Sequence, residues 1–121
     1  MDHLIGDVVK ATRRGHHEGY HYIIVWNGFD EGDDFIGIML TKNSTYVDNI
    51  LMSKEHFVEG NVLTWNESQH FVNRLLMKFA AWGPFTKVGE LTAVGVQFIT
   101  ENLQEIEPVP FEVYLAERKS A

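Results

Sequence analysis

The stretch that most constrains the fold is Tyr20 to Asn27, the densest run of β-branched and aromatic residues in the chain. Such residues favour strands. Gly19 precedes the run and Gly28 follows it, so turn-forming residues stand at both ends. We therefore predict a buried central strand over residues 20–27, between two reversals of the chain.

The composition indicates one mainly β domain. A chain of 121 residues that is 45% hydrophobic is long enough for one core and too short for two ordinary domains. Its ten glycines and eight phenylalanines favour strands and turns over a helical bundle. We expect a single domain over 1–121, of the mainly β (α+β) class.

Several classes of protein are disfavoured by what the sequence lacks. It has no cysteine, which excludes disulfides, thiolate catalysis and zinc sites built on cysteine. The first residues do not resemble a secretion signal, and no stretch is apolar for the roughly 18 residues that a membrane helix needs. We expect a soluble, cytoplasmic protein without a membrane partner.

Charge is segregated along the chain. The net charge of -7 works against general affinity for nucleic acid. A basic segment nevertheless runs from Lys10 to His17, directly before the central strand, while the acidic residues lie elsewhere. Any activity is therefore expected at the head of the central strand.

Other strands are expected on both sides of the central one. Residues 4–9 form a short apolar run, in which Gly6 marks a bulge or a close approach of another backbone. Residues 35–41 form the partner strand, and Gly37 would let it coil as small barrels require. Residues 48–52 are a further candidate.

The pairing of two of these strands predicts a contact between polar residues. If residues 20–27 and 35–41 pair antiparallel, the start of the first and the end of the second lie at the same edge of the sheet. Thr41 is therefore expected close to His21.

One helix is expected towards the C-terminal end. Thr92 is a good N-cap residue, and Pro108 stops the pattern that follows it. Between them, apolar side chains recur at helical spacing: Val96, Ile99, Leu103 and Ile106.

Three segments are assigned less directly. The apolar residues in 69–79 fit the spacing of a helix and also the period-two spacing of a strand. Ser53 could cap a single turn. In the tail, residues 107–121, the alternation over 111–115 predicts an edge strand or a frayed end, with disorder from Glu117 onward.

The segment from His17 to His21 reads His-Glu-Gly-Tyr-His, which matches the zinc-binding signature H-E-x-x-H. This signature works on a helix, where the two histidines share one face. Glycines on both sides of His17 and strand formers after the motif disfavour a helix. We therefore predict a polar loop feeding a strand. The alternatives are a metalloprotease zinc site, to which His56 or His70 could supply a third ligand, and a looser metal site.

The acidic turn at residues 28–34 invites a calcium interpretation. Its spacing does not match an EF-hand loop, and the distal glutamate of such a loop is missing. We expect a solvated hairpin tip, and predict neither a metal nor a cofactor for the protein.

A second group of residues suggests chemistry on phosphate. Metal-free RNA cleavage needs a base for the 2'-hydroxyl, an acid for the leaving 5'-oxygen, and a cation or donors for the phosphorane. Histidine suits the first two roles and arginine the third. The candidates are Arg13, Arg14, His16, His17, His21 and Thr41. The alternative is a mixed basic loop that keeps an exposed edge soluble.

Four stretches together resemble the PemK/MazF toxin family, which are small dimeric endoribonucleases of toxin-antitoxin modules. They are the opening Gly-Asp-Val-Val at 6–9, the strand at 21–25, Ile-Met-Leu-Thr at 38–41, and Lys-Val-Gly-Glu-Leu-Thr at 87–92. The resemblance covers residues 4–104. It implies a small SH3-like β-barrel with a C-terminal helix starting near Thr92, and a strand within 69–79.

The resemblance also implies roles for individual residues. Gly6 and Asp7 match the first strand of the family, and Thr41 matches its hydroxyl residue near the phosphate. The family usually has Arg-Pro at the head of the second strand, where this chain has His21-Tyr22. An arginine for the phosphorane would then have to come from the preceding loop, from Arg13 or Arg14.

Two functions of different class follow. The first is a metal-independent endoribonuclease acting on single-stranded RNA, in which Arg14 and Thr41 hold phosphate and His17 or His21 moves protons. The second is a noncatalytic small-barrel interaction or binding protein. An antitoxin protein would be a partner in the first case.

The resemblance further predicts a homodimer. Barrels of this family leave an apolar face that a twofold partner usually covers. This chain offers Phe79, Trp82, Phe85 and the alternating segment 111–115 as surplus apolar surface.

Overall fold

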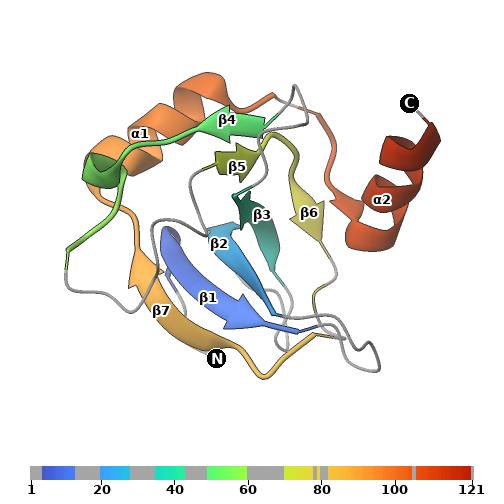
Figure 1. Cartoon of the computed structure of the whole chain (residues 1–121), viewed down its shortest axis with the longest axis horizontal. Coiled ribbons are helices and arrows are strands. Elements are labelled where there is room, and N and C mark those ends of the chain that lie inside the picture. The colour runs from blue at the N-terminus through green and yellow to red at the C-terminus, as the bar shows by residue number, and fades with distance from the viewer. Residues whose placement is uncertain are drawn as a thin grey trace.

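The computed structural model describes residues 4–12, 20–27, 35–42, 49–59, 70–77, 79, 82–104 and 106–120. These residues form a mainly antiparallel sheet with two helices, an α+β arrangement (Figure 1). The predicted fold class is confirmed at this level.

The strands are β1 (Asp7–Ala11), β2 (His21–Asn27), β3 (Ile36–Thr41), β4 (Asn49–Leu51), β5 (His70–Val72), β6 (Leu76–Met77), β7 (Thr86–Glu90) and β8 (Val109–Pro110). Their order is β4-β5-β3-β2-β1-β7, and β6 pairs with β3 and, in parallel, with β8. The short strands β4, β5 and β6 confirm the strand predictions for 48–52 and for 69–79.

Strand β2 is the centre of the sheet, as predicted. It pairs antiparallel with β1 on one side and with β3 on the other, and Ile23, Ile24 and Val25 are fully buried. Gly37 of β3 lies directly against it. A Cβ on Gly37 would stand 2.7 Å from Cγ2 of Ile23, so this position requires glycine for close packing.

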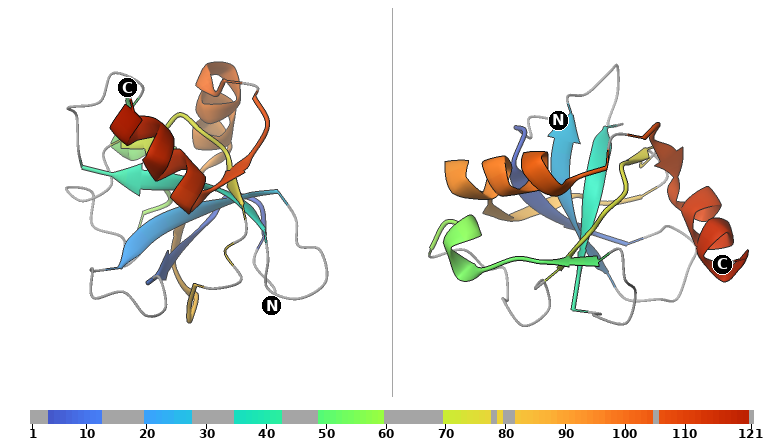
Figure 2. Two further views of the ribbon diagram at one scale, coloured as in Figure 1. Left: turned by 90° about the vertical axis from the view of Figure 1, so that its right-hand side faces the viewer. Right: turned by 90° about the horizontal axis from the view of Figure 1, so that it is seen from above.

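Alternate side chains of the central strands enter two apolar clusters. One cluster contains Ile23 and Met39 together with Phe111 of helix α2 (Phe111–Ser120). The other contains Ile24 together with Ile99 of helix α1 (Ala93–Asn102). The two helices therefore pack against different faces of the curved sheet, as the views in Figure 2 show.

The two ends of the sheet meet at one point without closing it. Phe57, after β4, forms a single antiparallel bridge with Leu91, after β7, and the Val58 amide donates to the Glu90 carbonyl at 3.0 Å. Through the described residues the sheet is otherwise open between β4 and β7. The backbone that links β7 to α1 is thus tied to the chain that leaves β4.

Gly6 confirms the prediction of a close backbone approach. Its φ of 94° lies in the left-handed region, which glycine adopts at low cost. In that conformation its amide donates to the Val25 carbonyl and its carbonyl accepts from the Leu91 amide, each at 2.8 Å. Gly6 thereby joins β1 to the entry of α1.

Helix α1 begins where the sequence predicts. The Thr92 hydroxyl accepts a hydrogen bond from the Gly95 amide at 3.1 Å, which is an N-cap interaction. Ile99 is fully buried, whereas Val96 is half-buried. The helix ends at Asn102, so the prediction that the helical stripe continues to Ile106 is wrong.

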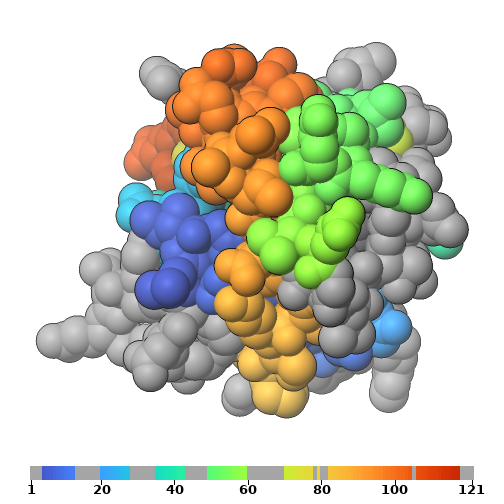
Figure 3. Space-filling model, turned by 90° about the vertical axis from the view of Figure 1, so that its left-hand side faces the viewer, coloured from blue at the N-terminus to red at the C-terminus, as the bar shows by residue number. Residues whose placement is uncertain are grey.

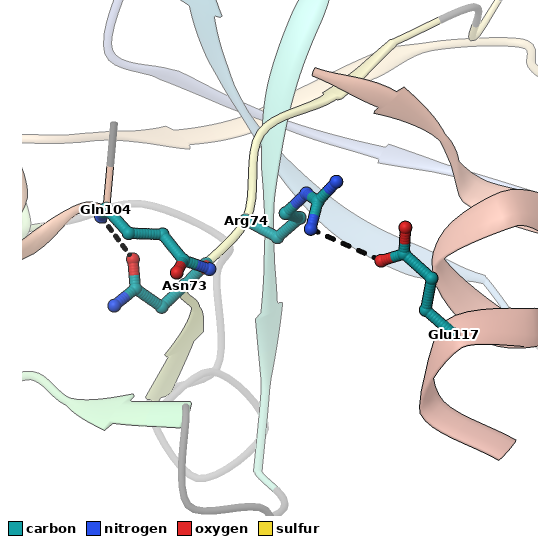
Figure 4. Close-up of polar contacts among 4 residues, drawn as sticks. All are labelled: Asn73, Arg74, Gln104 and Glu117. Carbon is teal, nitrogen blue, oxygen red and sulfur yellow. Dashed lines mark hydrogen bonds and ion pairs between the residues drawn. The ribbon is translucent and has the colours of Figure 1, made fainter. Parts of the chain in front are cut away.

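The turn between β5 and β6 explains the early end of α1. The Asn73 side chain accepts from the Gln104 amide at 2.8 Å, as Figure 4 shows. It also donates to the Asn102 carbonyl at 3.2 Å. The Gln104 side chain also donates to the Asn73 carbonyl. These bonds satisfy backbone groups that a longer helix would have paired within itself.

A one-turn 3₁₀ helix, η1 (Lys54–His56), packs against the start of α1. Ser53 precedes it, as predicted for a capped turn, and the Ser53 amide donates to Nδ1 of His56 at 3.0 Å. The His56 carbonyl accepts from the Thr92 amide at 2.9 Å, and the Thr92 hydroxyl donates to the Glu55 carbonyl at 2.8 Å. The start of α1 is therefore fixed to η1 by backbone groups.

His56 makes the stability of this junction depend on pH. Burial lowers the pKa of His56 below its ordinary value of 6.5, and the nearby Glu55 carboxylate opposes this to a lesser extent. The unfolded chain therefore binds the proton more tightly than the folded chain, and stability falls as pH drops below about 6.5. Urea unfolding of the wild type at about pH 7.5 and pH 5.5 should show this loss, and His56→Gln should reduce it. Equal losses in both proteins would contradict the assignment to His56.

The predicted extended edge strand over 111–115 is wrong, because these residues begin helix α2. Phe111, Tyr114 and Leu115 recur at i, i+3 and i+4 and bring their side chains to one face. Phe111 and Tyr114 are buried in the cluster that also holds Phe79 and Trp82. In the described part of the tail, the strand is β8, Val109–Pro110.

Helix α2 also covers the apolar surface on which the homodimer prediction depended. Phe79 is fully buried and Trp82 is 2% exposed, both within the same chain. The homodimer stays a prediction, without these side chains as its basis.

Apolar contacts should dominate the attachment of α2. The Arg74 guanidinium pairs with the Glu117 carboxylate at 3.2 Å, but the Glu117 side chain is 49% exposed (Figure 4). We expect Phe111→Ala to lower the free energy of unfolding by about 3 kcal/mol, and Glu117→Gln to lower it by less than about 1 kcal/mol. Urea titration of both variants measures the difference. A larger loss from Glu117→Gln would contradict it.

No helix among the described residues is long and apolar enough to span a membrane.

Candidate functional site

The structure describes two of the four residues predicted to be catalytic. His21 is the first residue of β2, and Thr41 is the last residue of β3. Arg14 and His17 lie outside the described residues, as do Arg13 and His16. The five residues of the H-E-x-x-H segment are divided in the same way, since only its Tyr20 and His21 are described.

The expected proximity of His21 and Thr41 is confirmed. Tyr22 pairs with Leu40 in the ladder between β2 and β3, so the next position outward sets His21 against Thr41. Both residues line one pocket of about 190 Å³. The antiparallel register thus creates a site that contains an imidazole and a hydroxyl.

The wall of this pocket is mostly apolar. Met39, Leu40 and Val72 contribute from β3 and β5, and α2 contributes Phe111, Tyr114 and Leu115. Tyr114 adds a second hydroxyl group to the lining. A small apolar pocket with a few convergent polar groups is typical of a ligand site.

Aromatic rings hold the His21 side chain in place. Its ring centroid lies 5.4 Å from that of Trp82 and 5.8 Å from that of Phe111, both in tilted arrangements. Trp82 and Phe111 are themselves in edge-to-face contact at 5.3 Å. The imidazole is therefore packed between the β6–β7 connection and α2, and is not a freely moving surface group.

His70 is a candidate for the site that the sequence interpretation considered only as a possible metal ligand. It is the first residue of β5 and lies directly opposite Thr41 in the ladder between β3 and β5. Directly opposed residues in an antiparallel ladder share one face of the sheet. His21, Thr41 and His70 therefore form a row across three adjacent strands, β2, β3 and β5.

The environment of His70 is unusual for a structural histidine. His70 is 8% exposed, and its Nδ1 atom is buried without a hydrogen-bond partner among the described residues. A buried polar atom without a partner costs free energy and calls for an explanation. The ladder therefore places His70 next to Thr41, although the sequence separates it from the basic segment.

The end of the basic segment that the structure describes lies close to the head of β2. Lys10 pairs with Tyr22 in the ladder between β1 and β2, and its ammonium group lies 4.4 Å from the centre of the Tyr20 ring. Tyr20 and Tyr22 alternate with His21 along the chain, so this cation–π contact places the Lys10 charge on the face of the sheet opposite to His21.

A buried acidic residue lies at the other end of β1. Asp7 is 4% exposed, and its carboxylate pairs with Lys87 at 3.2 Å and accepts from the Leu4 amide at 2.9 Å. These contacts hold the first turn against β7. Asp7 therefore has a structural role, and it lies at the opposite end of β1 from the strand pairing that brings Ala11 to His21.

Among the described residues, no group of three or more histidine or acidic side chains could hold a metal ion. Comparison with protein-family models, with curated proteins and with solved structures finds no match.

Proposed function

We propose that this protein is a metal-independent endoribonuclease acting on single-stranded RNA, of the toxin type that its sequence resembles. The observation that carries the proposal is the row His21–Thr41–His70 across β2, β3 and β5. Neighbouring strands are about 4.8 Å apart, so the backbones of the two histidines lie roughly 10 Å apart with Thr41 between them. This separation can accommodate a phosphate between two imidazoles.

The chemistry that the row supports is transfer of the phosphoryl group to the neighbouring 2'-oxygen. One imidazole, as base, takes the proton of the 2'-hydroxyl while its oxygen attacks phosphorus. The bond from phosphorus to the 5'-oxygen breaks, and the second imidazole donates a proton to that oxygen. The products are a 2',3'-cyclic phosphate and a free 5'-hydroxyl.

The other groups have supporting roles in the proposal. The Thr41 hydroxyl donates a hydrogen bond to a nonbridging phosphate oxygen. Arg14 or Arg13 supplies the positive charge that stabilises the phosphorane. The pocket walled by α2 receives the base next to the scissile bond, since aromatic side chains such as Tyr114 stack on bases.

The proposal includes a finer description of the fold. We infer an SH3-like barrel of the PemK/MazF type, in which the curved order β4-β5-β3-β2-β1-β7 and the bridge between Phe57 and Leu91 support near-closure. A small antitoxin protein as partner, and a homodimer, belong to the same proposal.

The test is cleavage of a mixed-sequence single-stranded RNA in EDTA. The wild type should cleave it and leave 2',3'-cyclic phosphate ends, or the 3'-phosphates that they yield on hydrolysis. The rate should depend on pH with a maximum, because one imidazole must be neutral and the other protonated. Absence of cleavage at micromolar enzyme would reject the proposal.

A noncatalytic binding protein is the second candidate, favoured by the apolar lining of the pocket. Its walls of methionine, leucine, valine and aromatic side chains suit binding of a nucleobase or a peptide side chain without reaction. Saturable binding of an uncleaved RNA, weakened by Tyr114→Ala, would support this candidate over the enzyme.

A further inference from the structure

A second concave surface lies on the side of α1 that faces away from the sheet. It is a shallow groove of about 470 Å³ between η1 and α1, which meet on the face of the molecule in Figure 3. Its lining includes Glu55, His56, Val94, Gln97, Phe98 and Glu101. The pocket with His21 belongs to the opposite face of the sheet, so the groove is a separate site.

The floor of the groove is apolar and accessible. Val94 and Phe98 are one helical turn apart on α1, and their side chains share its outer face. Val94 is 57% exposed, although it is an aliphatic residue on a helix. Phe98 stacks on the His56 ring, with centroids 4.3 Å apart and planes 21° apart. Together these side chains offer an apolar surface that no described residue covers.

Two carboxylates line the groove, one from each element. Glu55 lies on η1 and accepts a hydrogen bond from the Ser53 hydroxyl at 3.3 Å. Glu101 lies near the end of α1 and accepts from the Gln97 side chain at 2.8 Å. Neither carboxylate forms an ion pair with a described residue. The groove therefore has two oriented negative charges without a counter-charge in the described part of the chain.

His56 adds a hydrogen-bond donor to the groove. Only 6% of this residue is exposed, and its Nδ1 accepts from the Ser53 amide at 3.0 Å. In the neutral imidazole the proton is then on Nε2, on the edge of the ring away from Ser53. Nε2 has no partner among the described residues. Burial lowers the pKa of His56 more than Glu55 raises it, so the ring stays neutral and does not repel a cation.

We propose that the groove between η1 and α1 binds a basic, partly apolar segment of a partner protein. Basic side chains of that segment pair with Glu55 and with Glu101. An apolar side chain packs on Val94 and Phe98, and a backbone carbonyl accepts from Nε2 of His56. Charge complementarity selects this occupant, because the two carboxylates in this groove attract cations and repel anions.

Fluorescence anisotropy with two short labelled peptides tests the proposal on the full chain. One peptide alternates arginine and leucine, and the other alternates glutamate and leucine. The arginine peptide should bind saturably and the glutamate peptide should not. The double variant Glu55→Gln/Glu101→Gln should weaken binding by about tenfold or more, and Val94→Lys should do the same at an exposed position that tolerates lysine.

The matched control removes two negative charges elsewhere. The double variant Glu107→Gln/Glu112→Gln, at exposed positions outside the groove, should bind the arginine peptide as the wild type does. Equal weakening by both double variants would show general charge attraction and overturn the proposal. Equal binding of both peptides would overturn it as well. Sedimentation that shows self-association abolished by Val94→Lys would identify a second copy as the occupant instead.

Discussion

Gly95→Ala is expected to be strongly destabilising, although alanine is the better helix former. A Cβ at this position would stand 2.2 Å from the carbonyl oxygen of His56, a distance that no real contact reaches. The obstacle is backbone, so it cannot move aside as a flexible side chain would. The helix must therefore shift away from η1, which strains the bonds from the Thr92 amide and hydroxyl to the carbonyls of His56 and Glu55.

The cost of the close contact exceeds the gain in helix propensity, so Gly95→Ala should lower the free energy of unfolding. Replacing glycine by alanine inside a helix gains about 1 kcal/mol of propensity. Overpacking against a fixed neighbour costs about 1–3 kcal/mol, and losing the two hydrogen bonds from Thr92 costs about 0.5–1.5 kcal/mol each. We expect a net loss of about 2–4 kcal/mol, a large part of the stability of a domain of this size.

Urea titration followed by circular dichroism measures the loss. Thr100→Ala is the control, since Thr100 is exposed on the same helix and its hydroxyl only donates to the Val96 carbonyl. That variant should stay within about 0.5 kcal/mol of the wild type. If Gly95→Ala were as stable as Thr100→Ala, the close contact between α1 and η1 would be wrong.

Local patterns were sufficient for most of the fold. The apolar run at 20–27 predicted β2, and Thr92 predicted the start of α1, because each signal is carried by neighbouring residues. The choice of strand for 69–79 came from the resemblance, since its spacing fits helix and strand equally. The structure has the short strands β5 and β6 there, interrupted by the turn at Asn73.

Helix α2 could not be predicted because its apolar residues fit both the spacing of a strand and the spacing of a helix. Phe111, Val113 and Leu115 alternate as in a strand, whereas Phe111, Tyr114 and Leu115 follow helical spacing. Packing on Trp82 and on the His21 ring favours the helix, and those contacts join residues far apart in sequence. The end of α1 has a similar cause, since Asn73 binds it from another part of the chain.

The candidate site could also be predicted only where residues close in sequence determine it. His21 and Thr41 could be placed together because one antiparallel hairpin determines both positions. His70 could not be added, because the sequence does not give the register of β5 against β3. A one-residue slip of β5 would turn His70 to the other face of the sheet.

RNA cleavage should depend on both histidines of the row. We expect His21→Ala and His70→Ala each to lower the cleavage rate by about 10²–10⁴-fold, the usual contribution of a general acid or base. The double variant should lose little more than either single variant, because an acid and a base that act in one step are not additive. Thr41→Val should weaken the reaction by about 1.5–3 kcal/mol, the value of one hydrogen bond to a charged group.

A second readout separates catalysis from folding in these variants. His70 is buried, so His70→Gln is included as a variant that keeps a polar side chain, and circular dichroism confirms that each protein is folded. Added imidazole should restore part of the activity of His21→Ala and His70→Ala, whereas it cannot rescue a protein that has merely lost stability. Thr100→Ala, on the outer face of α1, should cleave as the wild type does. Full activity of folded His70→Ala would remove it from the mechanism and leave His17, in the preceding loop, as the partner of His21.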